Sequence, residues 1–208
     1  MTVAPHVIAI VPVGRLEGAK SRLGAVLDAE ERHDLATRLL ESTLRSLAAT
    51  PGLTETYVVT PDDDVRDLAL AAGARPLRQR TGGLNDGVRA ARDEAIAAGA
   101  TAVLIVPTDL PGLTPDAIAP LLATLERTGP PLVALVADRH GRGTNALLLA
   151  PPDIIDPRFG GDSFPAHTTA GEAVGATVVV LDGPLAVDID TPDDLLLAEA
   201  MDPAFARG

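Results

Sequence analysis

The sequence lacks cysteine and is very poor in aromatic residues. It contains three Phe, one Tyr and no Trp among its 208 residues. Without cysteine, the chain has no disulfide framework, no thiolate metal site and no cysteine nucleophile, which is compatible with a reducing cytoplasm. Hydrophobic residues still make up 46% of the chain. Because large aromatic side chains are scarce, the interior must be built from small aliphatic residues, which suits a sheet covered by helices.

Positive charge is also scarce. The chain carries 17 Lys and Arg against 29 Asp and Glu, a formal net charge of −12, and Lys20 is its single lysine. A nucleic-acid partner would require a basic face and aromatic platforms for unpaired bases, so we expect none. The apolar run 6–13 lacks a basic leader and is too short to span a bilayer. We therefore expect a cytoplasmic protein without a membrane segment.

Short runs rich in Val and Ile alternate with longer amphipathic stretches along the chain. This alternation predicts an α/β fold with a largely parallel sheet covered by helices. The length fits one domain over residues 1–208. A capping box at Asp28 and Glu31 predicts a helix toward residue 49, and Thr114 and Thr191 each precede a proline that suits a first helical position. The expected strands are 7–13, 56–60, 102–106, 132–137, 146–149 and 177–181.

The segment 11–23 leaves the first predicted strand as a glycine-bearing loop. Backbone N–H groups there, with the positive charges of Lys20 and Arg22, are typical of a phosphate cradle. An ordinary surface loop remains an alternative. The loop nearly matches a P-loop, but Ala19 stands where the second glycine belongs, and a non-periodic stretch follows Ser21 instead of a helix. A P-loop NTPase therefore stays as a minority interpretation.

Three aspartates stand where a hard cation would find ligands. Asp109 ends an apolar strand, and the carboxyl ends of strands are where ligands bind in open α/β sheets. Asp188 and Asp190 alternate on an extended segment, so both carboxylates can face one ion. Together they predict a Mg²⁺ site completed by substrate phosphates. By contrast, Asp193 and Asp194 are assigned to helix stability, and the acidic run 62–64 to a helix cap.

Three further segments are rich in polar and turn-forming residues. The first, 81–87, brings glycines and the Asn85 amide close to a nucleotide, or else simply leads into a helix. The second, 138–145, offers Arg139 and Arg142 as anion-binding groups and Thr144 as a hydroxyl ligand, or forms a tight hairpin turn. In the third, 159–167, Ser163 is expected to cap a helix. A structural role also explains His167, because no Gly-x-Ser-x-Gly elbow accompanies the histidines.

Six motifs in order resemble one family: Val-Pro-Val…Ala-Lys-Ser-Arg-Leu, Gly-Leu-Asn, Pro-Thr-Asp-Leu-Pro, Asp-Arg-x-Gly-x-Gly-Thr-Asn-Ala-Leu, Phe-Gly-x-x-Ser-Phe-x-x-His and Asp-Ile-Asp-Thr-Pro-x-Asp-Leu. The family is the phosphoenolpyruvate or 2-phospho-L-lactate guanylyltransferases of coenzyme F-420 biosynthesis. More distantly, the chain is similar to the molybdenum cofactor guanylyltransferases. The likeness spans residues 7–200. Each motif alone is weak, but the ordered set is specific.

The resemblance implies a Rossmann-like nucleotidyltransferase fold, with helices on both faces of a mixed, mostly parallel sheet. It implies transfer of GMP from GTP to phosphoenolpyruvate, with 2-phospho-L-lactate or 3-phosphoglycerate as alternative acceptors, and delivery of the product to a downstream transferase. Members often carry lysine after Val-Pro-Val, so either Arg15 supplies this cation or the nucleotide contact is remodelled. A binding module without turnover is the non-enzyme alternative. The implied catalytic residues are Lys20 and the metal ligands Asp109, Asp188 and Asp190; those for GTP are Val13, Gly14, Arg15, Lys20, Arg22, Gly83, Leu84 and Asn85; those for the acceptor are Thr144, Gly160, Ser163, Arg139 and Arg142.

Overall fold

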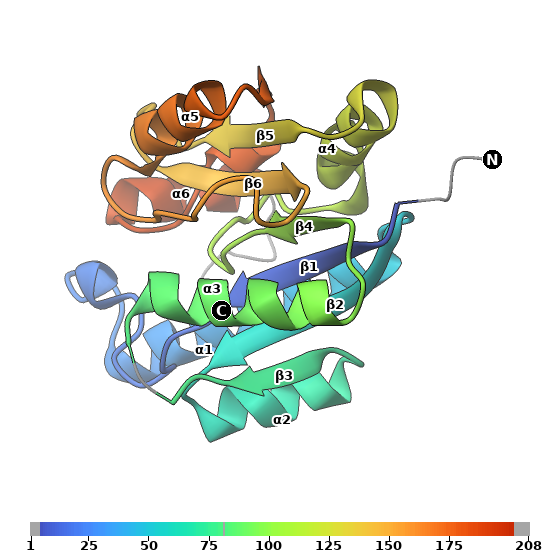
Figure 1. Cartoon of the computed structure of the whole chain (residues 1–208). Helices are drawn as coiled ribbons and strands as arrows, with labels where there is room; N and C mark the ends of the chain where they lie inside the picture. Colours follow the sequence, from blue (N-terminus) through green and yellow to red (C-terminus); the bar gives the residue numbers. More distant parts are fainter. Residues whose placement is uncertain (1–4, 81, 202–208) are drawn as a thin grey trace.

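A seven-stranded sheet forms the centre of the computed structural model, which describes residues 5–80 and 82–201 (Figure 1). The strand order is β3-β2-β1-β4-β6-β5-β7, and β6 runs antiparallel to both of its neighbours while all other pairs are parallel. The predicted mixed, mostly parallel sheet is therefore confirmed. Its strands are β1 (Val7–Pro12), β2 (Leu53–Thr60), β3 (Arg75–Arg78), β4 (Ala102–Ile105), β5 (Leu132–Ala137), β6 (Thr144–Ala150) and β7 (Thr177–Val180).

Helices cover both faces of this sheet, as predicted (Figure 1). On one face, α1 (Ala29–Ala49), α2 (Asp63–Ala71) and α4 (Pro115–Thr128) share an apolar cluster with the strands. On the other face lie α3 (Leu84–Ala97) and α5 (Ser163–Ala173). The last described helix, α6 (Pro192–Met201), packs with α1 in a third cluster, which also holds Leu23 and Ile189. This third cluster anchors two segments of the site, the loop after β1 and the segment before α6.

The sequence located six of these strands and missed β3. With the sequence Arg-Pro-Leu-Arg, β3 is short, half exposed and without an apolar run. A proline is tolerated there because β3 is an edge strand, so no second neighbour needs its missing N–H group. Strand β6 begins two residues earlier than expected, at the buried polar residues Thr144 and Asn145. The prediction relied on apolar runs, so it missed β3 and the polar first residues of β6.

The expected helix boundaries are largely confirmed. Asp28 accepts a hydrogen bond from the N–H of Glu31, whose carboxylate accepts from the N–H of Asp28, which completes the capping box. Thr114 caps α4 through the N–H of Ala117. No helix within the described ranges 5–80 and 82–201 is both long and apolar enough to cross a membrane.

Candidate active site

A cavity of about 560 Å³ opens at the carboxyl ends of β1 and β4. The strand order reverses between these two strands, and ligands of open α/β sheets bind at such a point. Segments far apart in sequence meet around the cavity. They contribute Pro12, Val13 and Gly14 after β1, Pro107, Thr108 and Asp109 after β4, Asp138 and Gly143 to Asn145 at the β5–β6 turn, Phe159 to Gly161 and Ser163 at α5, and Asp188 and Asp190 before α6.

The three predicted metal-binding aspartates come from two segments that are tied together. The N–H of Ile189 donates to the backbone carbonyl of Asp109 at 2.9 Å, which fixes the 188–190 segment against the loop after β4. From the neighbouring strand β6, the Asn145 amide donates to the Leu185 carbonyl at 2.9 Å and reaches Asp188 Oδ1 at 3.4 Å. Asp109, Asp188 and Asp190 therefore all stand on the wall of one cavity.

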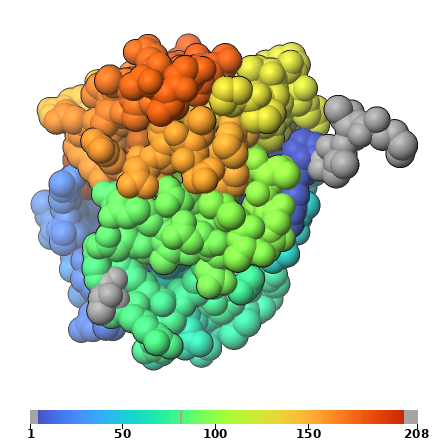
Figure 2. Space-filling model, viewed as in Figure 1, coloured from blue at the N-terminus to red at the C-terminus, as the bar shows by residue number. Residues whose placement is uncertain are grey.

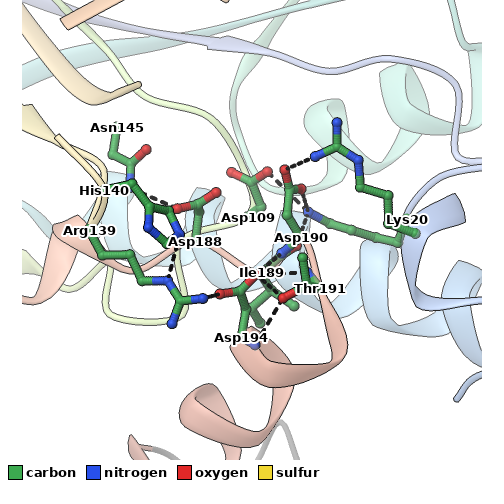
Figure 3. A network of polar contacts seen from close by, with 11 residues as sticks. Lys20, Asp109, Arg139, His140, Asn145, Asp188, Ile189, Asp190, Thr191 and Asp194 are labelled. Carbon is green, nitrogen blue, oxygen red and sulfur yellow. Dashed lines mark hydrogen bonds and ion pairs between the residues drawn. The ribbon is translucent and has the colours of Figure 1, made fainter. Parts of the chain in front are cut away.

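Lys20 lies between two of these carboxylates (Figure 3). Its Nζ is 3.0 Å from Asp109 Oδ2 and 3.6 Å from Asp190 Oδ1, and it donates to the Ile189 carbonyl at 2.6 Å. The Lys20 backbone adopts φ 53°, in the left-handed region that non-glycine residues seldom occupy. The loop after β1 therefore turns sharply at Lys20 and directs its ammonium to the carboxylates of Asp109 and Asp190, which we call the acidic cluster together with Asp188.

The electrostatics of the cavity favour a cation. Burial raises the pKa of Asp188, and the negative charge of Asp109 raises it further. Among the described lining residues, four are aspartates and only Arg22 is cationic, so a polyphosphate would enter a repulsive environment unless it brought cations with it.

The predicted three-carboxylate metal site is not assembled in this geometry. Within residues 5–80 and 82–201, no three acidic or histidine side chains lie close enough together to hold one ion. Lys20 and Arg22 contact the two carboxylate oxygens of Asp190, at 3.6 and 3.1 Å. Asp109 and Asp188 retain oxygens that suit a hard cation, and Mg²⁺ is commonly held by one or two carboxylates plus substrate phosphates. The donor chemistry therefore fits Mg²⁺ in this smaller form.

Arg139 does not line the cavity, and its predicted role as an anion-binding group is not supported by its contacts. Its guanidinium is 2.5 Å from Asp194 Oδ1 (Figure 3). The other oxygen of Asp194 accepts from the N–H groups of Thr191 and Asp190 at 2.7 and 3.2 Å. Asp194 thus stabilises the start of α6 as expected, and it also fixes the backbone that carries Asp190.

Asp62, at the start of α2, fixes the loop between β1 and α1. Asp62 caps that helix through the N–H of Asp64, as predicted, and its second oxygen accepts from the N–H of Leu16 at 2.9 Å. Arg15 is exposed and does not line the cavity. After Lys20 comes only the 3-10 helix Ser21–Leu23, and α1 begins at Ala29. The P-loop alternative is therefore wrong, since a P-loop runs directly into a helix.

Asn85 connects the start of α3, predicted to bind the nucleotide, to the Phe159 loop, predicted to bind the acceptor. Its amide donates to the Phe159 carbonyl at 3.0 Å and accepts from the Phe159 N–H at 2.7 Å. Figure 2 shows the orange segment after β6 lying directly on the green α3. These two bonds make Asn85 a positioning residue for the Phe159 loop, and Asn85 does not itself line the cavity. Leu84 lines the cavity, and Gly83 precedes α3 as its N-cap, whereas Thr81 lies outside the described residues.

Two hydroxyl residues form another part of the cavity wall. Thr144 and Ser163 both line the cavity, and the Thr144 N–H donates to Ser163 Oγ at 2.8 Å. Ser163 is the first residue of α5 and not its cap; Asp162 holds the cap position, so that expectation was wrong. Gly160, at φ 149°, supports the turn before the helix. Arg142 pairs with Asp162 at 2.8 Å as an exposed group away from the cavity.

Behind this wall lies His167, which is fully buried. Its Nε2 accepts from the Arg158 N–H at 2.8 Å, and its Nδ1 is 3.0 Å from Thr144 Oγ1. Burial, assisted by the positive charge of Arg158, lowers the pKa of His167 to about 4, so the ring is neutral near pH 7. The sequence assigned His167 a structural role and did not connect it to Thr144.

Asn145 is a second residue whose importance the sequence analysis missed. It is a buried amide near the start of strand β6, and buried polar groups require hydrogen-bond partners. That signal was available in the sequence as an Asn directly before an Ala- and Leu-rich run. The partners, Leu185 and Asp188, are about 40 positions away and could not be identified from spacing.

Comparisons with known proteins agree with this geometry. The chain is 46% identical over 190 residues to the phosphoenolpyruvate guanylyltransferase of Sphaerobacter thermophilus, covering 90% of each chain. It is 42% identical over 196 residues to the protein of the same name in Rubrobacter xylanophilus, covering 93% of this chain and 94% of the relative.

Solved structures show the same fold at low sequence identity. A protein of Desulfovibrio desulfuricans G20, described as a candidate nucleotide-diphospho-sugar transferase, superposes with a TM-score of 0.78 at 18% identity, covering 98% of this chain and 91% of that one. A 4-diphosphocytidyl-2C-methyl-D-erythritol synthase gives a TM-score of 0.64 at 16% identity, covering 97% and 100%. The family model for "Guanylyl transferase CofC like" matches residues 7–201. The chain therefore belongs to the CofC-like guanylyl transferase family.

Proposed function

We propose that this protein transfers GMP from GTP to phosphoenolpyruvate and releases pyrophosphate, as a step in coenzyme F-420 biosynthesis. The observation that carries the proposal is family membership over residues 7–201, with relatives up to 46% identical that are named phosphoenolpyruvate guanylyltransferase. The cavity supports it, because an acidic wall and a hydroxyl wall face one space of about 560 Å³, which is large enough for a nucleotide and a small acid.

In this proposal the nucleotide lies against the segment after β1 and the start of α3. Val13, Gly14, Arg22 and Leu84 line that part of the cavity. An added Cβ at Gly14 would meet no atom within 4 Å, so its backbone is open to a close approach by phosphate oxygens. Arg15 does not line the cavity, so in this proposal Arg22 supplies the cation on its wall, and Lys20 adds positive charge beside Asp109 and Asp190.

The acceptor is proposed to lie against Thr144, Gly160 and Ser163. Two hydroxyl donors beside a glycine turn suit an anionic group, since they supply hydrogen bonds without the bulk of a long cationic side chain. Arg139 and Arg142 are not included, because each is paired with an aspartate outside the cavity.

Asp109 and Asp188 would hold Mg²⁺, together with phosphate oxygens of the substrates. When bound, the ion neutralises the charge that develops on the phosphates and aligns them. Asp190, paired with Lys20 and Arg22, is the third proposed ligand if those two cations move to the nucleotide phosphates.

The proposed reaction requires no general base. The second pKa of a phosphate monoester is near about 6, so the acceptor phosphate is already an oxyanion at neutral pH. One of its oxygens forms a bond to the α-phosphorus of GTP, the bond to the bridging oxygen breaks, and pyrophosphate leaves with the electron pair. The protein contributes alignment of two anions and positive charge from Lys20 and Arg22. The product contains a reactive phosphoanhydride, and we propose that a downstream transferase consumes it.

Pyrophosphate release tests the proposal directly. The purified protein is assayed with GTP and Mg²⁺ and with phosphoenolpyruvate, 2-phospho-L-lactate or 3-phosphoglycerate, and ATP then replaces GTP. Pyrophosphate that depends on phosphoenolpyruvate and GTP supports the proposal. A preference for another acceptor would retain guanylyl transfer and correct the substrate, whereas tight GTP binding without turnover on any acceptor would favour a binding module.

A further inference from the structure

His167 is a buried polar group that the proposed reaction does not use directly. It sits on α5, four residues after Ser163, with no exposed surface. The Phe159 ring contacts it edge to face, with the two ring centroids 5.2 Å apart. Since Phe159 and Ser163 both line the cavity, His167 lies directly behind the wall that is proposed to bind the acceptor.

The hydrogen bonds of His167 determine which ring nitrogen carries the proton. The partner of Nε2 is the backbone N–H of Arg158, which can only donate, so Nε2 accepts. The neutral ring must then carry its proton on Nδ1, and Nδ1 donates to Thr144 Oγ1 at 3.0 Å. This assignment follows from the donor character of a backbone amide and needs no assumption about the ligand.

The position of the His167 proton affects the hydroxyl groups that line the cavity. Because Thr144 Oγ1 accepts from His167, its own hydroxyl proton is free to point to another acceptor. Ser163 Oγ likewise accepts, from the Thr144 N–H, and keeps its proton available. A protonated, doubly donating His167 would not alter this polarity at Thr144, but it would lose the bond from Arg158 and place an unpaired charge in the interior.

We propose that His167, with its proton on Nδ1, is a positioning residue for the acceptor: it fixes the Thr144 hydroxyl as a hydrogen-bond donor to the anionic substrate. The hydrogen bond that the Arg158 N–H donates to His167 Nε2 also fixes the loop that carries Phe159 and Gly160. The inference rests on the proposed function, because it assigns Thr144 to the acceptor. The ligand of the Thr144 hydroxyl in this proposal is a small anion with carboxylate or phosphate oxygens.

Two substitutions at His167 separate its two hydrogen bonds. In His167→Asn, the amide nitrogen lies near the position of Nδ1 and retains a donor to Thr144. In His167→Gln, the amide reaches the position of Nε2, so it retains the bond from Arg158 and loses the donor. We expect His167→Gln to raise the KM for phosphoenolpyruvate about tenfold or more, because the Thr144 hydroxyl is no longer held as a donor to the anion. We expect His167→Asn to stay within about threefold.

Thr144→Val completes the test as a double-mutant cycle. If His167 acts through Thr144, His167→Gln adds little to the KM defect of Thr144→Val. The KM for GTP is expected to change less than about twofold in every variant, because the nucleotide wall is separate. Thr168→Val is the matched control, since its hydroxyl bonds only to the Phe164 and Pro165 carbonyls within α5.

The outcomes distinguish this inference from the proposed function. Wild-type protein without acceptor-dependent pyrophosphate release overturns both. An active wild type in which His167→Gln and His167→Asn lower the melting temperature equally, and change neither KM nor the pattern in the Thr144→Val background, assigns His167 to core packing alone. Fully additive KM effects of His167→Gln and Thr144→Val would also contradict the inference. If His167→Gln fails to fold, His167→Phe, which removes both hydrogen bonds, takes its place: an acceptor KM equal to that of His167→Asn would contradict the inference.

Discussion

The ammonium of Lys20 lies 3.0 Å from the carboxylate of Asp109, although the two residues are 89 positions apart. Lys20→Met keeps the length of the side chain and removes its charge, which leaves the acidic cluster without this cation. We expect kcat/KM for GTP to fall about 10²- to 10³-fold, since a positioned cation at the reacting phosphates is lost. Steady-state kinetics measure this, with the exposed Arg45 changed to Met as the control. A loss below about threefold would remove Lys20 from the catalytic machinery.

Asp109→Asn and Asp190→Asn test the proposed metal ligands. Each substitution preserves shape and removes a negative charge, so turnover should fall by at least about 10³-fold while the melting temperature changes by only a few degrees. Asp193→Asn, on the exposed face of α6, is the control and should retain activity. Near-native turnover of Asp109→Asn at saturating Mg²⁺ would contradict the metal assignment, whereas near-native turnover of Asp190→Asn alone would leave Asp109 and Asp188 as the ligands.

Asn85→Leu removes both hydrogen bonds to Phe159 and keeps a similar volume. Because Phe159 and Gly160 line the acceptor wall, we expect the KM for phosphoenolpyruvate to rise about three- to tenfold, with a smaller change for GTP. Glu94→Gln, an exposed substitution on the same helix, serves as the control. An effect confined to GTP would restore the direct nucleotide contact that the sequence motif predicted.

The sequence predicted the sheet and the acidic cluster because both have local signatures. Strands 7–13 and 102–106 are continuous apolar runs, Asp109 ends an apolar strand, and Asp188 alternates with Asp190 on an extended segment. The strand order and the reversed direction of β6 did not follow from such patterns. They depend on which strands pair, and Val103 opposite Leu149 is a contact between positions that no local rule links.

The ion-pair partners of Arg139 and Arg142 could not be predicted for a different reason. Spacing placed Arg139 and Arg142 beside Thr144, but a hairpin turn directs neighbouring side chains to different surroundings. Asp194 and Asp162, both distant in sequence, pair with these arginines, and neither arginine lines the cavity. The sequence gives the charge of a residue in a motif, but tertiary packing determines which residue pairs with it.

Arg139→Leu and Arg142→Leu form a matched pair that tests these assignments. Asp194 is almost fully buried, so loss of Arg139 leaves its charge poorly compensated. Because Arg139 itself is about one third exposed, we expect a modest loss of about 1–2 kcal/mol in the free energy of unfolding. The Arg142–Asp162 pair is at the surface, and Arg142→Leu should cost less than about 0.5 kcal/mol. Urea unfolding measures both; a rise in acceptor KM for Arg142→Leu alone would restore its anion-binding role.

The buried state of His167 also makes stability depend on pH. Its pKa is about 4 in the folded protein, against an ordinary value of 6.5, because burial and Arg158 disfavour the charged ring. Between these two values the unfolded chain binds more protons than the folded protein. The stabilising contribution is therefore complete above about pH 6.5 and is lost as the pH falls toward 4.

Comparison with His167→Phe isolates this contribution. Phe keeps an aromatic ring beside Phe159 but cannot titrate, and the other histidines are common to both proteins and cancel. Between pH 8 and pH 5, the wild type should lose about 2 kcal/mol more unfolding free energy than the variant, as measured by urea unfolding. Parallel pH profiles for the two proteins would mean that His167 is not held neutral. Its assigned proton on Nδ1, and with it the orientation of the Thr144 hydroxyl, would then no longer stand.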